Sequence, residues 1–150
     1  MSLDVYLHAA DPFPQDQTPK IFVREDGQTR QITRAEWDVR HPDDAPVMVR
    51  PAAETTVLYH DNITHNLCVM AQAVGLYAVL WQPETVGITH AAQARAGLEA
   101  GLGALRADPE GCRALAPANG WGTYAGLVRF VVRYLAACEI YPEARIEVWR

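Results

Sequence analysis

The residues best suited to chemistry gather in one short run, Tyr59 to Leu67, which reads Tyr-His-Asp-Asn-Ile-Thr-His-Asn-Leu. Its His65 and Asp61 are residue types that serve as general acids and bases. His60, Asp61 and His65 are also types that bind metal ions, and Cys68 follows His65 by one helical turn. No paired cysteines and no His-Glu-x-x-His spacing accompany them, so we predict no metal site, and instead a packed Cys68 with a hydrogen-bonded His65.

A second polar run, Asn119 to Tyr124, also comes directly before a helix-like stretch. The start of a helix leaves backbone N–H groups unpaired and carries a partial positive charge, so it attracts anions. If the two runs converge, they form a pocket for a small polar or anionic ligand. The asparagines would orient this ligand, the histidine would donate a hydrogen bond and the aromatic residues would stack against a ring. The ligand-contacting side chains would be Asn62, His65, Asn66, Trp121 and Tyr124.

A purely structural explanation of the same residues stays open. Asn62 and Thr64 are residue types that cap helices, because a short side-chain oxygen accepts from an unpaired backbone N–H. Asn119-Gly120 is typical of a turn, and Trp121 would then fill the core.

Several helices are predicted to position these runs. From Ile63, apolar residues recur at steps of three and four as far as Trp81, which indicates one helix ending near Gln82-Pro83. Thr89 is expected to cap a second helix with a buried stripe of small and apolar residues. A short helix follows Asp108-Pro109, and another long helix begins at Gly122 or Thr123 and runs to about Cys138. The predicted stripe of the second helix is Ala91, Ala94, Leu98, Gly101, Leu102 and Leu105.

The first sixty residues read mostly as strands. Leu3, Val5 and Leu7 alternate with polar neighbours, as in a strand with one buried face. Asp26-Gly27 separates two strand-like runs and suits the tight turn of a β-hairpin. The remaining predicted elements are a loop over 11–19, hairpin strands over 20–25 and 28–33, a capping box at Thr33 and Glu36 opening a helix over 34–39, strands over 47–50 and 55–59, and a strand over 144–149 that returns beside the first.

Together these elements predict an α+β fold in one domain spanning residues 1–150, which is within the usual size of a single domain. An N-terminal antiparallel sheet with a hairpin, mainly over 1–60, would pack on about three helices over 61–142. A terminal strand over 143–150 would return to the sheet.

Composition narrows the classes of function. A net charge of −5 and a pI near 5.5 argue against general nucleic-acid binding, which requires a concentrated positive face. No apolar run is long enough to span a membrane and the N-terminus lacks an export signal, so we expect no membrane association. Cys68, Cys112 and Cys138 cannot all pair within one chain, which favours a reducing cytoplasm. No glycine fingerprint for a nucleotide cofactor is present, and we predict no cofactor.

Five motifs, taken in order, resemble a group of small bacterial and phage-encoded proteins of unknown function. They are Asn62-Ile-Thr-His-Asn-Leu67, Leu80-Trp-Gln-Pro83, Gly87-Ile-Thr89, Asn119-Gly-Trp-Gly-Thr-Tyr124 and Tyr134-Leu-Ala-Ala-Cys138. The resemblance spans about residues 59–150, with the hairpin region 20–38 as an extension. It implies a compact domain without an assigned reaction, so no catalytic residue is carried over from it.

Three functions follow from these observations. The leading hypothesis is a non-catalytic cytoplasmic protein that binds a small polar or anionic ligand where the two helix starts meet. The second is a protein-interaction module, a homo-oligomer or a partner-binding protein, in which the hairpin lends an edge strand or the helices pair with a partner. The third is a small enzyme that uses His65 with Asp61, which requires both side chains to line one cleft.

Overall fold

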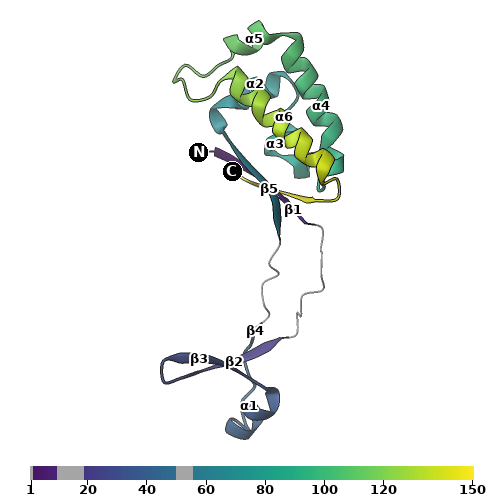
Figure 1. The fold of residues 1–150 in the computed structure, drawn as a ribbon. Coiled ribbons are helices and arrows are strands. Elements are labelled where there is room, and N and C mark those ends of the chain that lie inside the picture. The colour runs from purple at the N-terminus through teal and green to yellow at the C-terminus, as the bar shows by residue number, and fades with distance from the viewer. Residues whose placement is uncertain (1, 10–18, 50–55) are drawn as a thin grey trace. The chain divides into compact units, whose positions relative to one another are not determined.

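The computed structural model describes residues 2–9, 19–49 and 56–150, and the chain divides into two units (Figure 1). Unit 1 comprises residues 1–10 and 55–150, and unit 2 comprises residues 11–54. Each unit has its own antiparallel sheet accompanied by helix, so the α+β class is confirmed. That the two units act as one domain stays a prediction.

The sheet of unit 1 has three antiparallel strands in the order β5-β1-β6. The predicted alternation of the first strand is confirmed, because Leu3, Val5 and Leu7 are fully buried on one face. The predicted C-terminal strand is confirmed as well, since Val148 lies opposite Val5. The strands are β1 (Ser2–His8), β5 (Val57–Thr64) and β6 (Arg145–Trp149).

Two long helices, α4 and α6, pack against each other in unit 1, and α6 also packs against β5. The helix that was expected to begin at Gly122 or Thr123 begins at Tyr124, and Thr123 is its N-cap, whose side-chain oxygen accepts from the backbone N–H of Gly126. No described helix has both the length and the apolar composition needed to cross a bilayer. The helical elements are η1 (His65–Leu67), α2 (Cys68–Ala73), α3 (Tyr77–Trp81), η2 (Pro83–Val86), α4 (Ala91–Ala107), α5 (Pro109–Ala114) and α6 (Tyr124–Ile140).

The prediction of a single helix from Ile63 to Gln82 is wrong at two positions. Strand β5 continues through Thr64, because Ile63 pairs with Leu3 and keeps the alternation of the strand. The helical stretch that follows is interrupted at Gly75, whose φ of 75° lies in the left-handed region that favours glycine. The apolar spacing continues across this break, which is why the sequence pattern did not reveal it.

The predicted cap of α4 is displaced by one residue. His90 occupies the N-cap position instead of Thr89. The side chain of Gln93 accepts from the backbone N–H groups of both Thr89 and His90, at 2.8 Å and 3.0 Å. The buried stripe of α4 is confirmed residue for residue.

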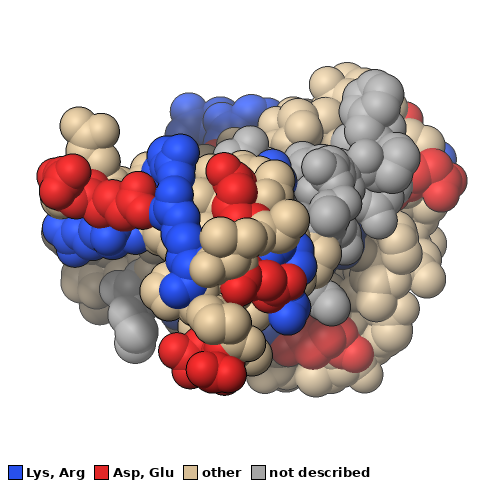
Figure 2. Space-filling view, turned by 90° about the horizontal axis from the view of Figure 1, so that it is seen from below, with Lys and Arg blue, Asp and Glu red and all other residues tan. Residues whose placement is uncertain are grey.

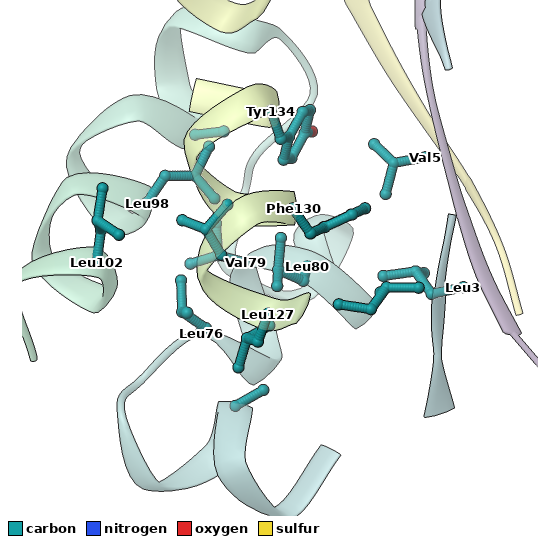
Figure 3. Close-up of a cluster of buried hydrophobic side chains, with 14 of the residues drawn as sticks. Leu3, Val5, Leu76, Val79, Leu80, Leu98, Leu102, Leu127, Phe130 and Tyr134 are labelled. Carbon is teal, nitrogen blue, oxygen red and sulfur yellow. The ribbon is translucent and has the colours of Figure 1, made fainter. Parts of the chain in front are cut away.

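Side chains from β1, the α2-α3 segment, α4 and α6 form the core of unit 1 (Figure 3). Phe130 and Tyr134 of α6 point toward Val5 and Leu3 of the sheet, while Leu98 of α4 lies on the other side of α6. Helix α6 is therefore enclosed by sheet on one side and helix on the other.

Unit 2 is organised around the predicted hairpin. Asp26 and Gly27 both have positive φ, 51° and 79°, as the two-residue turn requires. The capping box at Thr33 and Glu36 is also confirmed, but the helix that it opens buries none of its side chains. Only Ile21 and Ile32 are buried among the described residues of this unit. Its elements are β2 (Lys20–Glu25), β3 (Gln28–Ile32), α1 (Arg34–Arg40) and β4 (Met48–Val49), with strand order β3-β2-β4.

The predicted loop at 11–18, and the ends of two predicted strands at Arg50 and Thr55, lie outside the described residues.

The close packing of α4 on the α2-α3 segment depends on Gly101. A Cβ atom added there would lie 2.3 Å from Cγ of the fully buried Leu76, whereas one added at Gly103 of the same helix would have no atom of a described residue within 4 Å. We expect Gly101→Ala to lower the free energy of unfolding by about 1–3 kcal/mol because it overpacks the core. Gly103→Ala, the control, should raise it by about 0.5–1 kcal/mol. Urea denaturation measures both, and equal effects would contradict the packing.

Candidate functional site

The first polar run belongs mainly to strand β5, not to a helix start. Asn62 pairs with Asp4 across the sheet, so the prediction that Asn62 caps a helix is wrong. Thr64 does act as a cap, since its hydroxyl accepts from the backbone N–H of Asn66 at 3.3 Å and η1 begins there. Because side chains alternate along a strand, Asp61 and Asn62 point to opposite faces of the sheet.

Asp61 faces α6 and is fully engaged there. Its Oδ2 accepts from the Tyr59 hydroxyl at 3.0 Å and from Nε and Nη2 of Arg133 at 2.8 Å and 2.6 Å. Burial, with Asp61 adding to the effect, raises the pKa of Tyr59, so this phenol stays protonated and donates. Asp61 therefore ties β5 to α6.

Asn62 and His60 face the opposite side of the sheet, where both contact Asp4. The Asn62 amide donates to Asp4 Oδ1 at 3.0 Å, and His60 Nε2 lies 3.1 Å from the same oxygen. These contacts lower the pKa of the Asp4 carboxyl, with the Asn62 hydrogen bond as the largest cause. The His60 ring also stacks on Tyr6 at 4.4 Å between centroids.

His65 is half-buried against the core. Its ring meets Trp81 edge-on at 6.1 Å between centroids, and its Nδ1 is buried without a hydrogen-bond partner among the described residues. Asn66 is exposed, and its backbone N–H donates to the Thr64 hydroxyl. Neither His65 nor Asn66 lines the pocket that lies where the two polar runs meet, which is described below.

The second run forms a tight turn before α6. The Asn119 side chain accepts from the backbone N–H of Trp121 at 2.9 Å, and Gly120 and Gly122 both have positive φ. Trp121 is 73% exposed, which overturns the alternative in which it fills the core. The Tyr124 hydroxyl donates to the Leu105 carbonyl at 3.0 Å, so Tyr124 packs against α4 instead of facing a ligand.

The two polar runs meet at Gly122. A Cβ atom added to Gly122 would lie 2.8 Å from both Thr64 Cγ2 and Leu67 Cγ, so the two turns are in direct contact. Beside this contact lies an open pocket of about 310 Å3. Its lining residues are Asn62, Ile63, Thr64, Leu67, Gly122, Thr123, Gly126, Arg129, Phe130 and Arg133.

Two arginines of α6, which the sequence reasoning did not select, give the pocket its charge. Arg133 is neutralised by Asp61, whereas the exposed Arg129 forms no ion pair with any described residue. The two lie one helical turn apart on the outer side of α6, and this i, i+4 spacing was the only signal in the sequence. Among the described residues, the pocket thus has one guanidinium without an ion-pair partner, beside Thr64 and Thr123.

The candidate metal ligands are not brought together. Within the described ranges, no three His, Cys, Asp or Glu side chains are close enough to hold a metal ion. His60 and Asp61 face opposite sides of the sheet. Burial raises the pKa of the Cys68 and Cys112 thiols and raises that of Cys138 to about 12, so all three remain protonated.

Comparison of the chain with protein-family models, with curated proteins and with solved structures found no match. The resemblance to small bacterial and phage-encoded proteins therefore stays a prediction.

The contact between the two turns can be tested through Gly122. Its φ of 115° is a backbone conformation that side chains rarely adopt, and an added methyl group would also collide with Thr64 and Leu67. We expect Gly122→Ala to destabilise the protein by about 2–4 kcal/mol, as backbone strain and overpacking combine. Gly120→Ala is the control, because its φ of 72° is also positive but no atom of a described residue lies within 4 Å of the added Cβ. It should cost only about 1–2 kcal/mol in urea denaturation. Equal losses would show that the turns do not touch.

Proposed function

We propose that the pocket between β5 and α6 binds a small anionic ligand. The observation that carries this proposal is the exposed Arg129 in a pocket that both polar turns also line. A guanidinium offers several N–H donors in a planar fork that matches the oxygens of a carboxylate or phosphate. Thr64 and Thr123 add hydroxyls at the pocket wall, although the Thr123 oxygen already accepts from Gly126.

The electrostatics of the pocket support an anion over a cation. Asp61 and Arg133 cancel each other, so Arg129 leaves a local positive charge on a chain whose net charge is −5. On the face shown in Figure 2, acidic and basic residues are intermixed among the described residues. Recognition would therefore rest on the local guanidinium, and not on a broad positive field of the kind that nucleic acids require.

The proposal revises the residues expected to contact the ligand. Asn62 still lines the pocket, but its side chain faces the other side of the sheet and donates to Asp4. The side chains of His65 and Tyr124 are engaged elsewhere, with Trp81 and the Leu105 carbonyl. Arg129 takes the role that was predicted for His65, as the group that donates to the ligand.

Arg129→Gln should weaken anion binding about tenfold, the loss expected when one charge-assisted hydrogen bond is removed. The measurement is calorimetric titration with inorganic phosphate, pyrophosphate and nucleoside triphosphates at low salt. Arg106→Gln is the matched control, because Arg106 is also an exposed helical arginine without an ion pair among the described residues. If none of these anions binds the unmodified protein, or if both variants weaken binding equally, the proposal fails.

A further inference from the structure

Strand β5 has one edge without a strand partner among the residues that the structure describes. The order β5-β1-β6 leaves β1 as its only neighbour among the described strands. With eight residues, β5 is longer than a usual edge strand, which natural proteins keep short to avoid unwanted pairing. A long strand with an open edge is a surface on which another extended chain can add.

The backbone groups that face this open edge follow from the pairing. The backbone N–H of Ile146 donates to the Thr89 carbonyl, which lies on the side of β6 away from β1. Leu7 lies opposite Ile146, and because the two residues do not bond each other, Leu7 directs its backbone N–H and C=O toward β5. Leu7 pairs with Tyr59, so Tyr59 directs its backbone groups toward β1. By alternation, His60 and Asn62 direct their backbone N–H and C=O groups toward the open edge. The Asn62 N–H is taken by the Asp61 carboxylate, at 2.9 Å. The His60 N–H and the carbonyls of His60 and Asn62 have no hydrogen-bond partner among the described residues.

The pocket with Arg129 lies beside this edge. Asn62, Ile63 and Thr64 of β5 form one wall, and Arg129 and Arg133 of α6 belong to the other. Every second side chain of an added strand would point toward α6 and meet these arginines. The alternate side chains would lie on the other face of the sheet, beside the polar groups of His60 and Asn62.

We propose that β5 accepts an extended, acidic segment of a partner protein as an additional strand, with carboxylates of that segment bound by Arg129. The inference rests on the proposed anion site, because the same guanidinium would hold those carboxylates. The backbone of the segment would pair with the open groups of His60 and Asn62. Backbone pairing supplies affinity that does not depend on sequence, and Arg129 selects acidic residues at alternate positions.

Two other occupants fit this edge less well. A second copy pairing through its own β5 would bring the arginines of both α6 helices toward one groove, where like charges repel. A nucleic acid would satisfy Arg129, but its phosphate backbone cannot donate to the open carbonyls of His60 and Asn62. A peptide backbone alternates donors and acceptors and complements both.

The test uses a short, capped peptide that alternates glutamate and threonine, and two isomers of it. One isomer is N-methylated on every glutamate and the other on every threonine, which leaves charge unchanged. In an added strand only one of these residue sets directs its N–H groups toward β5. We therefore expect one isomer to bind as well as the parent peptide and the other to bind at least ~10-fold more weakly. Equal affinity of the two isomers, whether both bind or neither does, would overturn strand addition.

A second readout separates this inference from the proposed function. Arg129→Gln should weaken binding of the parent peptide about tenfold, while Arg106→Gln should leave the affinity for this peptide unchanged. Binding of phosphate or pyrophosphate without any binding of the parent peptide would overturn the inference and leave the anion site standing. If the parent peptide and only one of its isomers bind, and neither phosphate nor pyrophosphate binds, only the small-ligand proposal is overturned. Dimerisation of the free protein in sedimentation, abolished by the peptide, would show that a second copy occupies the edge and would overturn the inference.

Discussion

Helix α6 packs across the inner face of the β5-β1-β6 sheet, and this packing decides where the candidate residues of unit 1 lie. Phe130 and Tyr134 bury their rings against the side chains of β1, and Arg133 is tied to Asp61 of β5. Apolar burial supplies most of the energy of such contacts, while the ion pair between Arg133 of α6 and Asp61 of β5 fixes the position of the helix along the strand. The start of α6 is thereby brought beside the end of β5.

That position explains how two distant turns come to share one pocket. Gly122 has no side chain, so the turn before α6 approaches Thr64 and Leu67 closely. The helix then presents different residues to two environments: Leu127, Val131 and Tyr134 face the core, while Arg129 and Arg133 line the pocket. A single amphipathic helix therefore joins the core to the candidate site. Among the described strands, the same geometry leaves the far edge of β5 unpaired beside the arginines.

Much of the fold could be predicted because its signals are local. The alternation of Leu3, Val5 and Leu7 and the buried stripe of α4 follow the regular spacing of a strand and a helix. The Asp26-Gly27 turn needs positive φ, which these residue types tolerate. The end of β5 could not be predicted in this way. Asn62 and Thr64 are both good capping residues, and only the pairing of β5 with Ser2 to Asp4 keeps Asn62 in the strand. That pairing is tertiary and leaves no trace in the local sequence.

The candidate site was predictable only in part, for the same reason. The two turns do meet, yet His65 turns toward Trp81 and Tyr124 toward Leu105, because the core and α4 offer these side chains better contacts than the pocket does. Arg129 and Arg133 resembled ordinary solvent-facing residues of an amphipathic helix. Their role in the pocket depends on which strand edge lies beside that face of α6, and this emerges only when helix and sheet are assembled.

The most direct test of the central claim follows the backbone amides of the pocket by nuclear magnetic resonance while pyrophosphate is added. Thr64 and Gly126 come from the two opposing walls, and Gly103 lies on the exposed side of α4, away from the pocket lining. We predict that the Thr64 and Gly126 signals shift together along one saturating curve while Gly103 stays unchanged. Shifts of only one wall, or changes of equal size at Gly103, would contradict a shared anion site between β5 and α6.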